Sequence, residues 1–261
     1  MSRIIVVPGA DASGLGRGSV SLDDFDKEIG RLPGLIHLVD PEQVPGYQTN
    51  GVYALAFKDR VRGRPLRASP AAVPIMATES GVANSRPLFD VTGVAECDLT
   101  AQDPTFTPTL TFIGLFRPTP ESLDGTGENY LLRALEGTTG RLAFRITSGG
   151  TPTLLLTDEE TQGVAWTFGS SLVPGTPVVL AFVIDGATYK IFKDTGVLPA
   201  ASANKTLAPH PAAQFTFMGS KQASGSWRGR AGRMAVWNRA LNPAELIRAM
   251  DAFRDYYDVT T

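Results

Sequence analysis

Acidic side chains would carry the chemistry if this chain were a glycoside hydrolase. Such an enzyme needs two carboxyl groups flanking the scissile bond, and a strand presents them best at alternate positions, where both face one groove. Asp158, Glu159 and Glu160 are consecutive, so they cannot all face one groove, and they lie in the segment TDEETQG, which is typical of a hairpin tip. We therefore predict a solvated turn at this segment, and a protein that is not an enzyme.

Metal ligands and nucleophiles are sparse. Asp124 and Glu128 lie in the loop SLDGTGEN and could offer oxygen ligands to calcium, but the spaced Asp and Asn residues of a dedicated calcium loop are missing. His37 lies in the apolar run LIHLV and is interpreted as a satisfied core or edge histidine, whereas His210 in APHPAA is interpreted as a loop residue. Cys97 is interpreted as a small buried hydrophobe. We expect no metal and no other cofactor.

Aromatic rings mark candidate carbohydrate sites, because a sugar stacks its apolar face on an exposed ring. Trp237 lies in an apolar strand pattern and is interpreted as a core residue. Trp227 lies in the loop SGSWRG beside Arg228 and close to Arg230, so these three residues are the predicted ligand-binding site. The other available rings are Trp166, Tyr47, Tyr53 and Tyr130.

Charged residues are unevenly distributed along the chain. Two basic groups stand out, and their members are Lys58, Arg60, Arg62, Arg64 and Arg67, then Lys221, Arg228, Arg230, Arg233 and Arg239. Acidic residues concentrate between Glu121 and Glu136 and at Asp158 to Glu160. Opposite patches could steer the domain onto copies of itself, or onto an acidic scaffold or glycan. The alternative is that these residues form ordinary solvated faces.

Composition limits the class of protein. The chain has 261 residues, 43% of them hydrophobic, which is enough for an ordinary core. A net charge of -2 argues against nucleic acid as a partner, since that binding requires a dominant basic face. A single cysteine excludes an internal disulfide, and no apolar run reaches the length of about 18 residues that would predict insertion into a membrane.

Most of the chain has the two-residue periodicity of β-strands. The segment RLAFRIT places Leu142, Phe144 and Ile146 on one face and its arginines on the other, as a half-buried antiparallel strand does. Asp185 and Gly186 separate two strand patterns and predict a hairpin with a type I′ turn. Further strands are predicted at residues 35–39, 52–57, 110–116, 130–135, 153–156, 164–168, 214–218 and 233–237.

The closing stretch GRAGRMAVWNRALNPAELIRAM contains a Gly-framed strand and one convincing helix. Asn242 is a good N-cap, Pro243 suits the first helical position, and Glu245 can complete a capping box. Leu246 and later apolar residues at helical spacing predict a stripe through about Tyr256. This stretch is interpreted as a latch that covers a sheet, with Gly229 and Gly232 permitting the tight entry of its strand.

The first 31 residues differ from the rest, because they are rich in Gly, Ser and charge and contain one short apolar run. We predict an N-terminal arm at residues 1–31 and one β-sandwich domain at residues 32–261. The arm is interpreted either as a flexible or surface-draped leader, or as an attachment segment that docks through Arg3, Ile4, Ile5, Val6 and Val7.

The segments FMGSKQASGSWRGRAGRMAVWNRALNPAEL and GTPVVLAFVIDGATYKIFKDTGVL resemble the concanavalin A-like lectin/glucanase (laminin G-like) family, in the form often seen in bacterial and bacteriophage surface proteins. An extra Thr195 interrupts the usual Asp-Gly of the family at Asp194 and Gly196. The resemblance implies an all-β, two-sheet antiparallel jelly-roll sandwich with a short C-terminal helix. Hydrolytic members of this family carry a Glu-x-Asp-x-x-Glu strand, which does not occur here.

The resemblance and the low cysteine content together predict a structural protein of a bacteriophage virion, as a capsid decoration or tail fibre component. It would be made in the host cytoplasm, attach by its N-terminal arm, and have as partners other capsid or tail proteins and copies of itself, with a trimer as the first expectation. The alternative is a carbohydrate-binding module that grips a cell-surface polysaccharide through its concave sheet.

Overall fold

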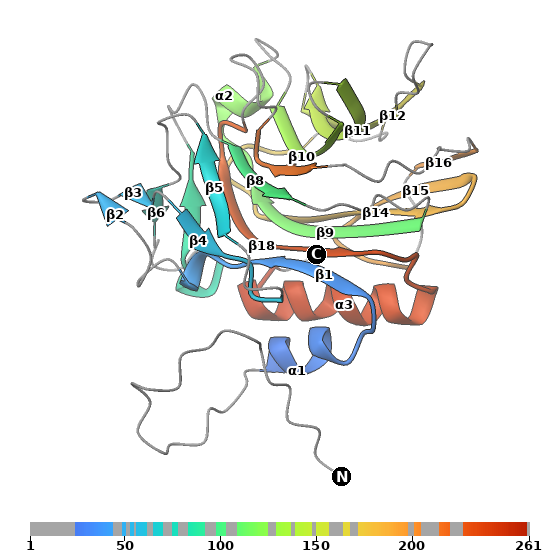
Figure 1. Cartoon of the computed structure of the whole chain (residues 1–261), viewed down its shortest axis with the longest axis horizontal. Helices are drawn as coiled ribbons and strands as arrows, with labels where there is room; N and C mark the ends of the chain where they lie inside the picture. The colour runs from blue at the N-terminus through green and yellow to red at the C-terminus, as the bar shows by residue number, and fades with distance from the viewer. Residues whose placement is uncertain are drawn as a thin grey trace.

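The computed structural model shows two antiparallel sheets packed face to face, with helices on the outer side of one of them (Figure 1). Within several short strands only the backbone is described. The structure describes residues 24–43, 49–50, 53–54, 56–61, 65–69, 75–77, 83–91, 98–102, 109–124, 129–136, 139–147, 150–156, 164–167, 172–197, 201–204, 214–219 and 227–259.

Sixteen pairings, all antiparallel, connect the described strands. The path of the 10-stranded sheet is β16 (Ala201–Asn204), β15 (Thr188–Lys193), β14 (Val178–Asp185), β9 (Thr109–Arg117), β18 (Arg230–Trp237), β7 (Leu88–Asp90), β6 (Ile75–Ala77), β3 (Tyr53–Ala54) and β2 (Thr49–Asn50), and β1 (Leu35–Val39) pairs with β18. The 8-stranded sheet runs β13 (Val164–Thr167), β12 (Thr151–Leu156), β11 (Thr139–Thr147), β10 (Asn129–Glu136), β17 (Gln214–Phe217), β8 (Asp98–Gln102), β5 (Pro65–Ser69) and β4 (Ala56–Lys58).

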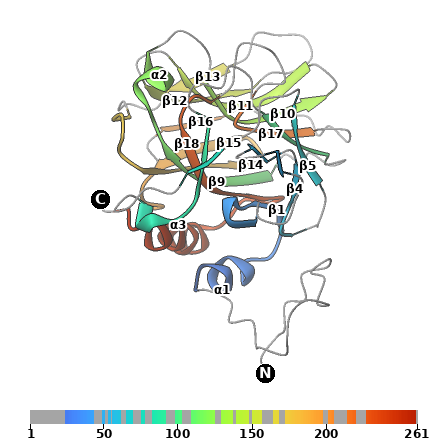
Figure 2. The ribbon, with the colours of Figure 1, turned by 90° about the vertical axis from the view of Figure 1, so that its left-hand side faces the viewer.

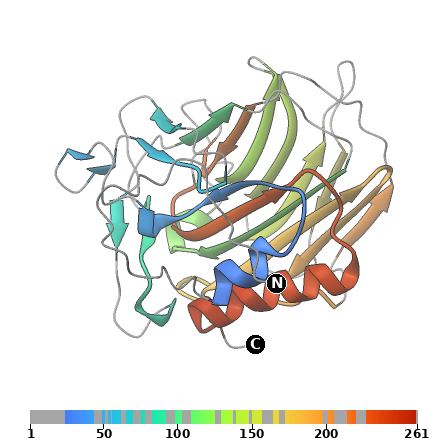
Figure 3. The same cartoon turned by 60° about the horizontal axis from the view of Figure 1, so that its bottom comes forward.

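The described helices are short, apart from the last one. They are α1 (Asp24–Gly30), the 3-10 turns η2 (Pro41–Gln43) and η3 (Ala83–Ser85), α2 (Pro120–Leu123) and α3 (Pro243–Tyr257). In Figures 2 and 3, α1 and α3 lie together on the outer side of the 10-stranded sheet, away from the 8-stranded sheet. None of the helices that the structure describes is long and apolar enough to cross a membrane. The predicted fold class, a two-sheet antiparallel sandwich with one short C-terminal helix, is confirmed.

Two apolar clusters stabilise these layers. The first fills the space between the sheets, where Phe112 stacks on Phe182 with ring centroids 5.5 Å apart and Phe144 meets both rings edge-on. The second lies between the outer face of the 10-stranded sheet and the two helices, and includes Trp237 and Phe253. The interpretation of Trp237 as a core residue is confirmed, since it is fully buried.

The predicted closing helix is confirmed in detail. The Asn242 side chain accepts a hydrogen bond from the Glu245 amide, and the Glu245 carboxylate accepts one from the Asn242 amide, each at 3.0 Å. Arg239 pairs with the same carboxylate through two hydrogen bonds of 2.7 and 2.8 Å. The Arg239 pair, aided by the Asn242 amide and opposed by partial burial, lowers the pKa of Glu245. The helix start is therefore fixed by both a capping box and an ion pair.

The β14–β15 hairpin is also confirmed, but its turn lies one residue later than predicted. Asp185 pairs with Thr188, which leaves Gly186 and Ala187 as the two loop residues. Gly186 has φ 57°, whereas Asp185 and Ala187 are not among the residues with positive φ. Positive φ at the first loop residue alone is the sign pattern of a type II′ turn, not of the type I′ turn that was predicted.

The sandwich begins before the predicted boundary at residue 32. Phe25 and Ile29 of α1 are buried in the second cluster, and the Phe25 ring lies 4.9 Å from that of Phe253. Their four-residue spacing gives α1 one apolar side that packs on α3. Residues 24–31 are therefore part of the folded body, and the predicted docking residues Arg3, Ile4, Ile5, Val6 and Val7 lie outside the described residues.

Candidate functional site

The prediction that Trp227 faces a ligand is wrong. The side chain is fully buried in the cluster between the sheets, edge-on to Phe116 with ring centroids 5.8 Å apart, and its Nε1 donates to the Arg230 carbonyl at 3.2 Å. Gly229 makes this possible, because a Cβ atom there would lie 2.5 Å from the indole ring. The missing side chain lets the ring fold back beneath the start of β18, a close approach that the loop-like sequence SGSWRG did not indicate.

Arg228 and Arg230 do not join Trp227 in a ligand-binding surface. Arg230 pairs with Asp90 at 3.0 Å, because β18 and β7 place the two residues opposite each other. Arg228 is half-buried, and its carbonyl accepts a hydrogen bond of 2.6 Å from the Thr119 hydroxyl. These contacts connect the start of β18 to its neighbours, so they are structural contacts.

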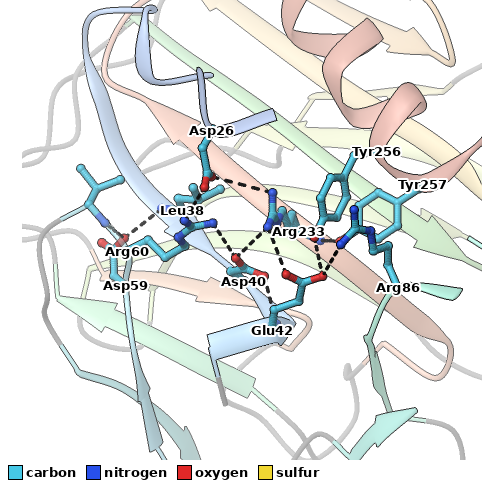
Figure 4. Close-up of polar contacts among 11 residues, drawn as sticks. Asp26, Leu38, Asp40, Glu42, Asp59, Arg60, Arg86, Arg233, Tyr256 and Tyr257 are labelled. Carbon is cyan, nitrogen blue, oxygen red and sulfur yellow. Dashed lines mark hydrogen bonds and ion pairs between the residues drawn. The ribbon is translucent and has the colours of Figure 1, made fainter. Parts of the chain in front are cut away.

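Six charged residues form a cluster on the outer side of the 10-stranded sheet, shown in Figure 4. The charged cluster consists of Asp26, Asp40, Glu42, Arg60, Arg86 and Arg233. Arg60 bridges Asp40 and Asp26 with contacts of 2.7 Å each. Burial disfavours the charge of Arg60, but these two carboxylates outweigh it and raise the pKa of the guanidinium. Two arginines of the predicted basic groups, Arg60 and Arg233, thus lie inside an ion network and not on a basic surface.

Arg233 is the central and most buried cation of the charged cluster. Its guanidinium lies 3.2 Å from Asp40, and its Cζ lies 3.9 and 4.4 Å from the ring centroids of Tyr256 and Phe25. A bulge in β18 aims it there: Ala231 and Met234 pair with Phe116 and Gly114, so two residues of β18 oppose one of β9. The bulge turns Arg233 toward the helices while Ala231 and Met234 both face the core.

Gly232 and Tyr257 complete the bulge. The Tyr257 hydroxyl accepts a hydrogen bond of 2.7 Å from the Arg233 amide, and a Cβ atom at residue 232 would lie 2.6 Å from the Tyr257 ring. Burial raises the pKa of the Tyr257 hydroxyl well above its ordinary value. Burial, followed by the hydrogen bond to Glu42, likewise raises the pKa of Tyr256. Both hydroxyls therefore stay neutral. The contacts of the charged cluster hold α1 and α3 against the 10-stranded sheet.

A second buried pair lies beside the charged cluster. His37 is fully buried, and its Nδ1 lies 2.7 Å from a carboxylate oxygen of Asp59. The other Asp59 oxygen accepts hydrogen bonds from the Leu38 and Val61 amides at 2.9 Å each. The interpretation of His37 as a core histidine is confirmed, and the pair fixes the segment after β4 against β1.

The outer face of the 8-stranded sheet carries a group that we call the Tyr130 patch: Tyr130, Arg133, Arg145 and Thr216. Arg145 and Thr216 each lie between two inward-facing apolar residues of their strands, so both face outward. Tyr130 pairs with Arg145, and Arg133 pairs with Thr216.

A bulge between Tyr130 and Leu132 of β10 brings the Tyr130 patch together. Leu131 and Leu132 both face the core, which leaves Tyr130 and Arg133, three residues apart, on the same outer face. The Arg133 and Arg145 guanidiniums lie 5.1 and 6.0 Å from the Tyr130 ring centroid. Tyr130 was among the rings considered from the sequence and the alternation of RLAFRIT placed Arg145 outward, but no sequence signal marked the bulge that adds Arg133.

Burial has the largest effect on the pKa values of Tyr130 and Arg145 in the Tyr130 patch. Burial lowers the pKa of Arg145. Burial raises the pKa of the Tyr130 hydroxyl, and the neighbouring Arg133 partly offsets that rise. Burial therefore disfavours the charge of Arg145. Among the described helices, α1 and α3 cover the other sheet, and α2 packs its Leu123 against the core between the sheets.

A hollow of about 420 Å³ lies on the opposite side of the molecule, between the β14–β15 hairpin and the start of α3. Its lining includes Val183, Phe192, Lys190 and Pro243. We assign it no ligand.

The remaining candidate residues from the sequence form no site within the described part of the chain. Asp124 caps the end of α2, and no group of three or more His, Cys, Asp or Glu suited to a metal occurs within the described ranges. Outside the described residues lie Glu128, Cys97, His210, Tyr47, Arg62, Arg64, Lys221 and Asp158 to Glu160.

Comparisons with known proteins match this fold. A family model described as the concanavalin A-like lectin/glucanases superfamily matches residues 115–247, about half of the chain. These residues include β10, β11 and β17, which carry the Tyr130 patch. No curated protein matches the chain in sequence.

Two solved structures show the same architecture. The Trypanosoma rangeli sialidase in complex with sialic acid superposes with a TM-score of 0.58 at 16% identity, covering 86% of this chain and 33% of the sialidase chain. Domain 4 of AbnA, a GH43 extracellular arabinanase from Geobacillus stearothermophilus, in complex with arabinotriose, superposes with a TM-score of 0.51 at 12% identity, covering 70% of this chain and 82% of that chain. The chain spans a third of the sialidase, and at these identities the likeness establishes the fold alone.

Proposed function

Because the chain belongs to the concanavalin A-like lectin/glucanase superfamily, we propose that it is a non-catalytic carbohydrate-binding module whose ligand lies on the outer face of its 8-stranded sheet. The observation that carries this proposal is the Tyr130 patch, where an aromatic ring and two arginines converge on one sheet face. Domain 4 of AbnA, of which this chain covers 82%, is bound to arabinotriose. This likeness supports a sugar as the class of ligand.

Two observations support the proposal that the module is non-catalytic. No Glu-x-Asp-x-x-Glu strand occurs in the sequence, and the described carboxylates Asp40 and Asp26 face arginines in the charged cluster. A glycosidase needs two carboxyl groups free to act on either side of a bond. Incubation with the polysaccharide that the protein binds is therefore expected to release no new reducing ends.

Replacing Tyr130 by alanine is expected to weaken polysaccharide binding about tenfold, because the ring supports both guanidiniums and cation–π contacts of this kind contribute about 1 kcal/mol or more. Binding of the wild type to a panel of bacterial surface polysaccharides identifies the ligand, and isothermal titration then measures the variants. Tyr130→Phe keeps the ring and is the matched control, so it should retain the affinity. Equal binding by all three proteins would place the ligand elsewhere.

The setting we propose is a bacteriophage virion, in which this module is displayed as a capsid decoration or tail fibre component. The resemblance of the closing stretch to phage and bacterial surface proteins supports it, as does a fold held by packing with one cysteine in the chain. Such assemblies are symmetric, so copies of the same chain are the expected partners.

The virion setting is tested on particles induced from the source strain and purified by density gradient. Mass spectrometry is expected to find this chain at a constant ratio to the major capsid or tail protein. A chain that lacks residues 1–23 is expected to keep the described fold, which circular dichroism checks, and it should be lost from particles if those residues attach it. Recovery of the full-length chain only in the soluble fraction would contradict the setting and leave the carbohydrate-binding proposal intact.

A further inference from the structure

The Tyr130 patch brings two guanidiniums to one tyrosine ring, in a chain whose net charge is -2. Arg133 and Arg145 come from neighbouring strands, and both guanidiniums lie within about 6 Å of one tyrosine ring, a distance at which cation–π attraction operates. Tyr130 is 7% exposed, whereas Arg133 and Arg145 are half-buried, so a ligand that approaches the sheet reaches the arginines more readily than the ring. This arrangement differs from a bare aromatic platform, on which a neutral sugar would stack.

We propose that the Tyr130 patch selects polysaccharides that carry carboxylates, with Arg133 and Arg145 pairing with the acidic groups. This inference rests on the proposed carbohydrate-binding function and names its ligand class. The planar guanidinium matches a carboxylate with two parallel N–H···O bonds, so two arginines on one face recognise acidic sugars along a chain.

Thr216 gives the patch a second polar group. It lies opposite Arg133 in the β10–β17 pairing, faces outward between Phe215 and Phe217, and is fully buried. Its Oγ1 has no hydrogen-bond partner among the described residues. A buried hydroxyl without a partner is unfavourable, and a ligand oxygen that reaches the base of the patch beside Arg133 would satisfy it. The site therefore combines two cations with a neutral hydrogen-bonding group, as recognition of an acidic sugar requires.

The test uses three polymers of defined charge: polygalacturonate with carboxylates, dextran sulfate with sulfates, and unsubstituted galactan. The full-length protein is expected to bind polygalacturonate at least tenfold more tightly than galactan, and raising the salt from 50 to 500 mM should weaken that binding about tenfold or more. Stronger binding to dextran sulfate than to polygalacturonate would show a general response to negative charge and overturn the selection of carboxylates.

Arg133→Gln and Arg145→Gln remove the charge and keep a shorter polar side chain that can still donate hydrogen bonds. Each is expected to weaken polygalacturonate binding about tenfold without changing the affinity for galactan. Arg248→Gln on α3, where the arginine is 56% exposed on the opposite side, is the matched control and should change neither affinity. Thermal unfolding of each variant confirms that it remains folded.

The results distinguish a failure of carboxylate selection from a failure of carbohydrate binding itself. If the wild type binds galactan as tightly as polygalacturonate, or if both glutamine variants keep full affinity for polygalacturonate, the inference is overturned while carbohydrate binding stands. If no polysaccharide of the surface panel or of these three binds, the proposed function fails as well. If Thr216→Val leaves the polygalacturonate affinity unchanged, the Thr216 hydroxyl does not contact the ligand. That result would contradict the role of Thr216 and leave the roles of the two arginines intact.

Discussion

Replacing Arg233 by alanine is expected to lower the free energy of unfolding by about 3–5 kcal/mol, one of the two largest effects predicted for a single substitution in this chain. Arg233 and Asp40 are both 2% exposed, so the variant leaves a buried carboxylate without its central partner. It also removes the guanidinium that packs against the rings of Phe25 and Tyr256. Urea unfolding followed by tryptophan fluorescence measures the loss.

Two further variants test whether the burial of Arg233 causes the large expected loss of stability. Arg230→Ala removes an ion pair in which both side chains are more exposed, and it should cost about 1 kcal/mol or less. Arg233→Met keeps much of the apolar volume but not the charge, so it should be intermediate between wild type and alanine. If Arg233→Ala lowers the free energy of unfolding as little as Arg230→Ala does, the charged cluster does not hold α1 and α3 on the sheet.

The ion pairs of the charged cluster could not be predicted from sequence periodicity. Arg60 and Arg233 fall in segments rich in arginine, and locally they resemble solvated basic faces. Their partners are distant in sequence: Arg60 meets Asp26 and Arg233 meets Glu42, at separations of 34 and 191 residues. The bulge that aims Arg233 at these partners depends on Gly232 and Tyr257 fitting together, and no local pattern encodes that fit.

Elements with strong local signals were predicted well. Alternation placed Phe144 and Ile146 in the core, and the cap residues Asn242 and Glu245 fixed the start of α3. Helix α1 was missed because a seven-residue segment with two apolar residues lacks a periodic signal, and its burial depends on α3, more than 200 residues later. The Tyr130 patch was not predicted as a site: its strands and the outward Arg145 followed from alternation, but the β10 bulge that adds Arg133 did not.

Trp227→Ala is expected to lower the free energy of unfolding by about 3–5 kcal/mol, the range for truncating a large aromatic residue in a core. The substitution removes the edge-on contact with Phe116 and the hydrogen bond to the Arg230 carbonyl, and it opens a cavity between the sheets. Thermal and urea unfolding measure the loss, and Trp227→Phe, which keeps a ring, should cost clearly less.

This substitution also distinguishes a core role for Trp227 from the ligand-binding role first assigned to it. If the ring is a core residue, polysaccharide affinity measured at low temperature, where the variant is folded, should equal that of the wild type, because the Tyr130 patch lies on the outer face of the other sheet layer. Loss of binding by Trp227→Ala with an unchanged free energy of unfolding would instead place the sugar at the start of β18. The two measurements on one variant therefore locate the ligand relative to the sheets, since stability and affinity are expected to change independently.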